Sequence, residues 1–96
     1  MAEHGEHHDT LFGEYLQLDR ARLEAYEIYA EATGDRLVEL GVLAARWRGL
    51  SDFWKRVRDD SDTPFLQRVS ADKAAIHASE RANWCSRAAV EQERTE

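Results

Sequence analysis

The sequence predicts an all-α protein of three helices, arranged either as a three-helix bundle or as an extended helical hairpin plus a third helix. Five Gly and one Pro among 96 residues leave few turns, and the prominent Ala, Leu, Glu and Arg favour helix. No window alternates apolar and polar residues as a strand does. Two long heptad patterns, described below, place packed faces on the second and third helices, and we expect the helices to assemble into a larger helical oligomer.

Residues 1–8 are expected to form a flexible, polar, His-rich tail, and residues 9–96 a single helical domain. A chain of this length can bury one core without disulfides or metal. The first helix is predicted over about residues 10–32 and ends near Gly34, since glycine readily adopts the left-handed conformation. Asp19 and Arg22 lie three residues apart within its broad apolar arc and can pair there.

The second helix is predicted over about residues 35–60 and carries the most regular pattern in the chain. Large apolar residues recur at gaps of 3 and 4, which is the spacing of one packed helix face. Two of these residues are tryptophans, so small residues should face them. The members of this tryptophan seam are Leu40, Leu43, Trp47, Leu50, Trp54 and Val57.

The third helix is predicted over about residues 64–92, with Thr63 as its cap and Pro64 in its first turn. Small residues recur along it at gaps of 4 and 3. We expect them to lie against Trp47 and Trp54, within one chain or between copies, because large and small side chains interdigitate well. The members of this alanine seam are Ala71, Ala75, Ala78, Ala82, Cys85 and Ala89.

The third helix has more apolar surface than two neighbours in a closed bundle would cover. A second apolar face lies well over 100° around the helix from the alanine seam, and its members are Phe65, Val69, Ile76 and Val90. This surplus predicts self-association or a protein partner.

A candidate protein-binding site lies off both of these faces. A tryptophan beside an arginine is a composition typical of interface hot spots. The alternative is that this tryptophan only caps the edge of the core. The residues of the candidate site are Trp84, His77, Arg81 and Ala88.

The tail offers a candidate metal site made of His4, His7 and His8, and a metal-handling protein is therefore an alternative function. Their spacing, without cysteine partners, matches no structural zinc pattern. The alternative is a polar tail that binds nothing, and we expect the protein to have no cofactor.

Charge and composition exclude several other classes. The formal net charge is −6, and residues 1–33 hold eight acids against Arg20 and Arg22, so nucleic-acid binding is not expected. No long apolar run and no signal peptide are present, which predicts a cytoplasmic protein without a membrane partner. The single cysteine, Cys85, excludes a disulfide within the chain.

We expect the protein not to be an enzyme, because no catalytic set can be assembled from the sequence. His77 and Cys85 are eight residues apart on one helix, or about 80° around it, too far for a nucleophile and its base. Paired Glu-x-x-His motifs, which hold metal in di-iron bundles, do not occur.

Trp47-Arg48-Gly49 resembles the W-x-G signature of a family of secreted helical hairpins, with a likeness that covers little more than Leu43 to Phe53. The resemblance implies a hairpin that pairs into a four-helix dimer, with the signature in the turn and a Tyr or acidic export signal after the second helix. Here the tryptophan seam continues through the signature, no tyrosine follows Tyr29, and Pro64 predicts a third helix.

These observations predict a non-enzymatic protein–protein interaction module that acts through helical packing. A small adaptor, an inhibitor, an assembly subunit and a virus-encoded accessory protein all belong to this class. The expected partner is another protein, further copies of this chain, or both.

Overall fold

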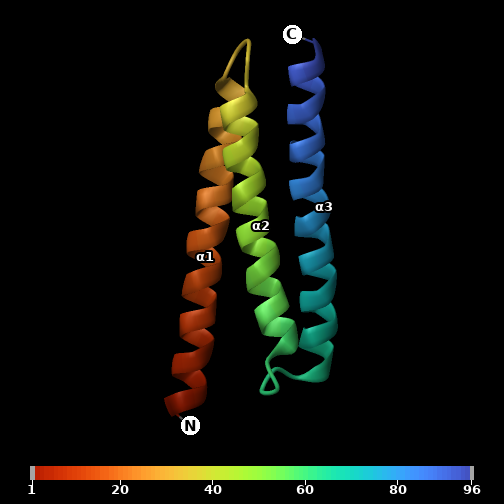
Figure 1. Cartoon of the computed structure of the whole chain (residues 1–96). Helices are drawn as coiled ribbons and strands as arrows, with labels where there is room; N and C mark the ends of the chain where they lie inside the picture. The colour runs from red at the N-terminus through yellow and green to blue at the C-terminus, as the bar shows by residue number, and fades with distance from the viewer. Residues whose placement is uncertain (1, 96) are drawn as a thin grey trace.

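The computed structural model describes the backbone of residues 2–95 and the side chains of residues 10–94. Within that range the chain forms three helices and no strand: α1 (Ala2–Glu31), α2 (Leu37–Asp59) and α3 (Phe65–Thr95) (Figure 1). The predicted all-α fold of three helices is confirmed.

The helix α1 starts at Ala2, earlier than the predicted start near residue 10. Residues 2–9 contain no proline, and acidic residues near a helix N-terminus are favourable because they face its partial positive charge. The side chains of the predicted tail lie outside the described residues, so the metal site built on His4, His7 and His8 stays a prediction.

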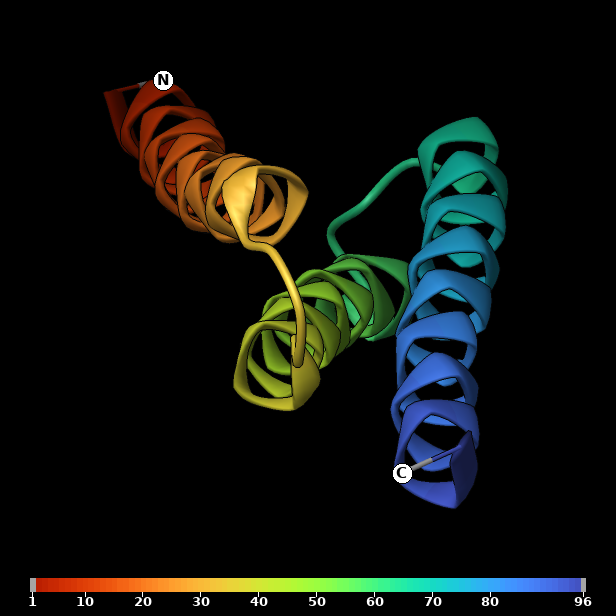
Figure 2. The ribbon, with the colours of Figure 1, turned by 90° about the horizontal axis from the view of Figure 1, so that it is seen from above.

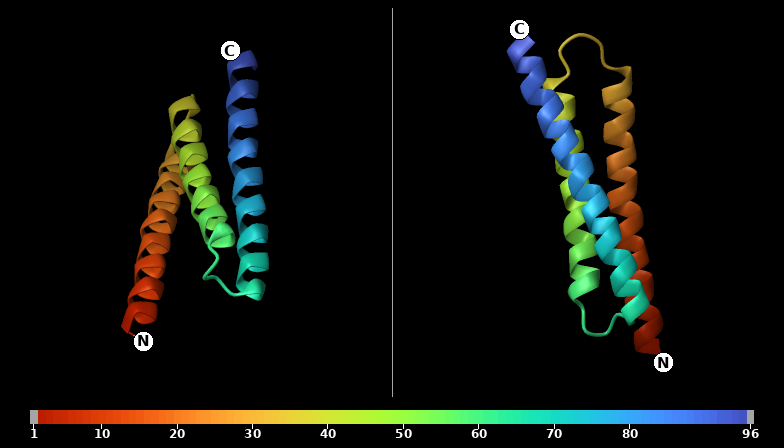
Figure 3. Two further views of the ribbon diagram at one scale, coloured as in Figure 1. Left: turned by 60° about the horizontal axis from the view of Figure 1, so that its bottom comes forward. Right: turned by 90° about the vertical axis from the view of Figure 1, so that its right-hand side faces the viewer.

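Local chemistry explains both turns, which lie at opposite ends of the molecule (Figure 3). Gly34 has a φ of 73°, the left-handed conformation that lets the chain leave α1. Asp35 Oδ1 then accepts a hydrogen bond from the Leu37 amide at 2.9 Å, at the start of α2. In the second turn Asp60 Oδ1 accepts a bond from the Asp62 amide at 2.9 Å, and Pro64 precedes α3.

The three helices form an open row with α2 in the middle (Figures 1 and 2). The helix α2 packs against both of its neighbours, most extensively against α3, whereas α1 and α3 do not pack against each other within the described residues. The result is an elongated molecule with extents of 57 × 20 × 13 Å. Of the two predicted arrangements, the structure has the extended one.

Small residues bring α2 and α3 close together. Five of the six members of the alanine seam are at most 2% exposed, and the sixth, Ala89, is half-buried. Between the helices, Ser51 is buried, and its hydroxyl donates to the Ala75 carbonyl at 3.2 Å and lies 2.6 Å from the Ser79 hydroxyl. The Ser51 hydroxyl has hydrogen-bond partners inside the contact. Burying this polar side chain between the two helices therefore costs little free energy.

The two tryptophans of α2 make different contacts. Trp47 packs against the core cluster that contains Cys85 of the alanine seam, and its ring meets His77 of α3 edge-on at 5.8 Å. The Trp54 ring lies 5.4 Å from the Tyr15 ring of α1 and 5.0 Å from the Phe53 ring, measured between ring centroids. The alanine seam is buried within one chain.

We predict that Ala78→Leu lowers the free energy of unfolding by roughly 1–3 kcal/mol, because the extra atoms have no room between α2 and α3. Urea titration followed by circular dichroism measures the loss. The matched control is Ala45→Leu on the exposed surface of α2, which should change the stability by less than about 0.5 kcal/mol. Equal stability of the two variants would mean that the seam is not closely packed.

Candidate protein-binding groove

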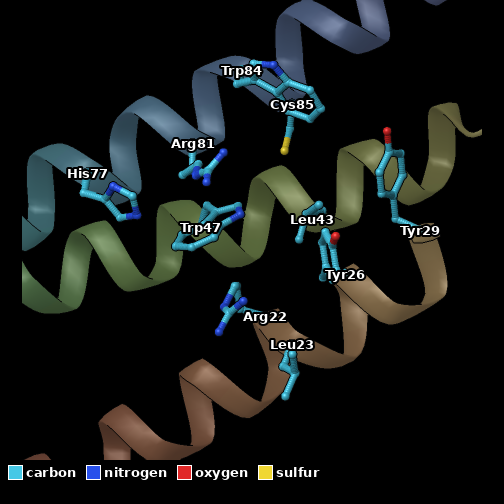
Figure 4. A pocket seen from close by; sticks show the side chains of 10 residues that line it. All are labelled: Arg22, Leu23, Tyr26, Tyr29, Leu43, Trp47, His77, Arg81, Trp84 and Cys85. Carbon is cyan, nitrogen blue, oxygen red and sulfur yellow. The ribbon is translucent and has the colours of Figure 1, made fainter.

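A groove with a volume of about 530 Å³ lies between α1 and α3, above α2 (Figure 4). Residues of all three helices line it. The residues that line it, hereafter the central groove, are Arg22, Leu23, Tyr26, Tyr29, Leu43, Trp47, His77, Arg81, Trp84 and Cys85.

The tryptophan seam supplies the floor of the central groove through Leu43 and Trp47. Leu43 is buried in the core cluster, together with Ala25 of α1 and Cys85 of α3, and Trp47 packs against that cluster while half-buried. A floor anchored to the core of all three helices holds the ring of Trp47 in a fixed position. Such a rigid aromatic surface loses little conformational entropy when a partner covers it.

Arg22 forms the wall of the groove on α1 and lies directly over its floor. Its guanidinium donates to Asp19 Oδ1 at 2.9 Å and lies 5.0 Å from the centre of the Trp47 ring, a cation–π contact. The predicted pair of Asp19 and Arg22 is therefore present. The Nε of Arg22 is buried and has no hydrogen-bond partner, so one donor in this wall is left unsatisfied.

The opposite wall, on α3, contains three of the four predicted binding residues. Trp84, Arg81 and His77 all line the groove, and Trp84 is 48% exposed. Ala88, the fourth, instead packs against the core cluster. The central groove thus presents three aromatic residues from α1 and α2 opposite an exposed tryptophan from α3.

The charge of the central groove has one sign. Two arginines and a histidine line it, and no carboxylate does. An acidic or anionic surface would complement it.

A second, more apolar depression of about 420 Å³ continues toward the other end of the α1–α2 contact. Leu11, Phe12, Tyr15, Phe53, Trp54 and Val57 line it. Phe12 is 62% exposed at its edge. Apolar surface therefore extends along the α1 side of the molecule beyond the central groove.

The one thiol at the bottom of the central groove is suited to packing. Cys85 is 2% exposed, and burial raises the pKa of its thiol above the ordinary value despite the nearby charges of Arg81 and Arg48. A thiol with a raised pKa carries less of the reactive thiolate at neutral pH. The described residues also hold no group of three or more His, Cys, Asp or Glu side chains placed to bind a metal.

Sequence reasoning did not identify the α1 wall of the groove. Leu23, Tyr26 and Arg22 fall within an apolar arc that covers nearly half of α1, and a helical wheel does not say which part of such an arc a neighbour covers. One signal was available for Arg22, which lies four residues after Leu18 and three before Ala25, and both of these residues pack toward α2.

Comparison with family models, curated proteins and solved structures finds no match to this chain. The structure also places Trp47-Arg48-Gly49 in the middle of α2, whereas the W-x-G signature lies in a turn between helices. The secreted-hairpin resemblance therefore supplies no function here. None of the helices, over the residues described, has a segment long and apolar enough to cross a membrane.

We predict that Trp47→Ala lowers the free energy of unfolding by about 3 kcal/mol, since it removes the ring that joins Arg22, His77 and the core cluster. Urea titration measures the change. Trp84→Ala is the matched control, and because Trp84 is 48% exposed we expect it to cost less than about 1 kcal/mol. A neutral Trp47→Ala would show that the groove floor does not support the fold.

We further predict that Cys85 in the folded protein resists iodoacetamide at pH 8 and is alkylated only as the chain unfolds. Burial and a raised pKa both act in this direction, because alkylation requires an accessible thiolate. Mass spectrometry of samples taken across a urea series follows the labelling. Complete labelling without urea, at the rate of a free thiol, would contradict the buried position.

Proposed function

We propose that this chain is a non-enzymatic protein–protein interaction module that receives an α-helix of its partner in the central groove. The observation that carries the proposal is the half-exposed Trp84, placed with Arg81 on one wall of a groove whose floor is Trp47. Tryptophan, tyrosine and arginine are the residues that most often dominate the energy of protein interfaces.

The shape of the groove supports a helix as the element that binds. Two helices form its walls and a third its floor, which is the surface that an added helix packs against in a helical bundle. Side chains at i, i+3, i+4 and i+7 of the incoming helix would contact Trp47, Tyr26 and Trp84 along one stripe. This is the helix-in-groove mode of recognition.

The charge of the groove supports an acidic partner helix. Arg22 and Arg81 lie around the aromatic floor without a carboxylate among the lining residues, although Arg22 is also paired with Asp19 beside the groove. Glutamates flanking the apolar stripe of the partner would complement the two arginines. Opposite charges of this kind mainly raise the association rate and select the partner.

The proposal predicts that Trp84→Ala reduces retention of the partner roughly tenfold or more, as expected for a hot-spot tryptophan, while the fold remains intact. Tagged wild-type protein and the variant are incubated with an extract of the source cells, and mass spectrometry quantifies each retained protein. Retained untagged copies of this chain count as a partner.

The matched control is Val42→Ala, which removes a similarly exposed apolar side chain, 42% exposed, that lies on α2 and does not line the central groove. Circular dichroism establishes that both variants are folded. We expect Val42→Ala to retain the same proteins as the wild type. If Trp84→Ala retained every protein as well as Val42→Ala does, the central groove would not be the binding site.

A further inference from the structure

The helix α1 carries a second heptad seam that the chain itself leaves uncovered. The seam that packs on α2 includes Leu18 and Ala25, and the second seam runs beside it, displaced by one residue. Its apolar members are 62%, 49%, 45% and 51% exposed, in chain order. The members of this outer seam are Phe12, Leu16, Asp19, Leu23 and Tyr26, at gaps of 4, 3, 4 and 3.

The outer seam lies next to the central groove. Leu23 and Tyr26 line that groove, and Leu16 and Leu23 line a further depression along α1. A helix seated in the groove would therefore contact the outer seam along its length. Exposed apolar residues at heptad spacing are the pattern of a helix that pairs with another helix.

We propose that the helix seated in the central groove is α1 of a second copy of this chain, and that the two α1 helices pair in parallel through their outer seams. The inference rests on the proposed function, because it names the partner of the same groove.

The acidic charge and the heptad spacing of apolar residues make α1 a suitable helix for the central groove. Eight acids in α1 stand against Arg20 and Arg22, so this helix is the acidic one of the molecule. Its outer seam supplies an apolar stripe that packs on Leu23 and Tyr26 at the α1 edge of the groove. In a two-fold dimer each copy gives the same helix and offers the same groove, so both contacts form twice.

Packing favours the parallel orientation. The helix α2 would lie under both α1 helices, and by symmetry so would α2 of the second copy. A two-fold axis perpendicular to the helices would place both α2 helices on the same side of the α1 pair, in the same space. A two-fold axis along the helices places them on opposite sides, where there is room.

Charge pairing favours the same orientation. In this heptad register Leu16 and Leu23 are at a positions, and Asp19 and Tyr26 are at d positions. Arg22 is then at a g position, and Glu27 is at the e position of the next heptad. In a parallel pair the g residue of one helix faces that e residue of the other. Arg22, whose side chain is 22% exposed, would meet Glu27 of the second copy, which offers a carboxylate to the exposed part of the guanidinium.

The first test is sedimentation equilibrium of the full chain over a concentration series. We expect a dimer for the wild type, and for Leu16→Glu a dimer dissociation constant at least about tenfold higher, because the change adds to the seam a carboxylate without a cationic partner, whereas Asp19 of the seam is paired with Arg22 in its own chain. Ile28→Glu is the matched control: Ile28 is 59% exposed on another face of α1, so this variant should dimerise like the wild type. Circular dichroism establishes that each variant is folded.

The second test is disulfide crosslinking and needs no disruptive change. In a parallel pair every seam residue faces its own counterpart, so Leu16→Cys and Leu23→Cys should each crosslink to a covalent dimer under mild oxidation. An antiparallel pair brings only residues near its axis together with their counterparts, so it cannot crosslink both. Ile28→Cys is the control and should form no covalent dimer.

A monomer at every concentration, or a dimer that Leu16→Glu leaves unchanged, would overturn the inference, and crosslinking at only one seam position would overturn its parallel form. The proposed function would survive these results if Trp84→Ala still lost a different retained protein. The proposed function itself would be contradicted by a different result, in which Trp84→Ala retains every protein that the wild type retains.

Discussion

The structure depends on the close approach of α3 to α2 through the alanine seam. Alanine side chains extend little beyond the helix surface, so the two backbones can lie near each other and exclude water from the seam. Ser51 adds a hydroxyl that is satisfied across the contact by the Ala75 carbonyl and by Ser79. Outside the seam, Arg58 joins Asp72 at 3.0 Å near the turn, and Arg48 donates to Ser86 at 2.6 Å. The position of α3 is thereby fixed against one side of α2.

This close contact determines where the large side chains of α2 go. Trp47 and Trp54 are half-buried: Trp47 packs against the core cluster and His77, and Trp54 lies against Tyr15 of α1. The helix α1 packs on α2 through a different face, with Leu18 contacting the position of Gly49 and Tyr15 beside Trp54. The central groove is the space left between two neighbours that each cover a different side of α2. Its aromatic floor is a consequence of the small residues in α3.

Much of this architecture is predictable from the sequence, because heptad spacing, Gly34 and Pro64 define the helices and their turns by local rules. The burial of Ala71 to Cys85 and the proximity of Trp84, Arg81 and His77 also follow from spacing on one helix. Which helix packs against each face does not follow from the sequence, because a helical wheel gives the angular position of a residue and not the helix that it contacts. The ring contact between Trp54 and Tyr15 of α1, for example, is not predicted by the heptad spacing. The buried position of Ser51 is not predictable from the sequence, because a serine in a helix pattern does not show whether its hydroxyl has hydrogen-bond partners inside the protein.

The unequal packing of the three helices has a consequence for the motions of the chain. The helices α2 and α3 share the extensive, close interface, whereas over the described part of the chain α1 packs mainly on α2 and is joined to it through the turn at Gly34. Loss of the α1 contacts would leave most of the α2–α3 interface in place. Local opening is therefore expected to cost least at α1, and the free energy of opening should rise from the first helix to the other two, as in proteins that unfold by separate cooperative units. Amide hydrogens of α1 would then exchange with solvent before those of the α2–α3 hairpin.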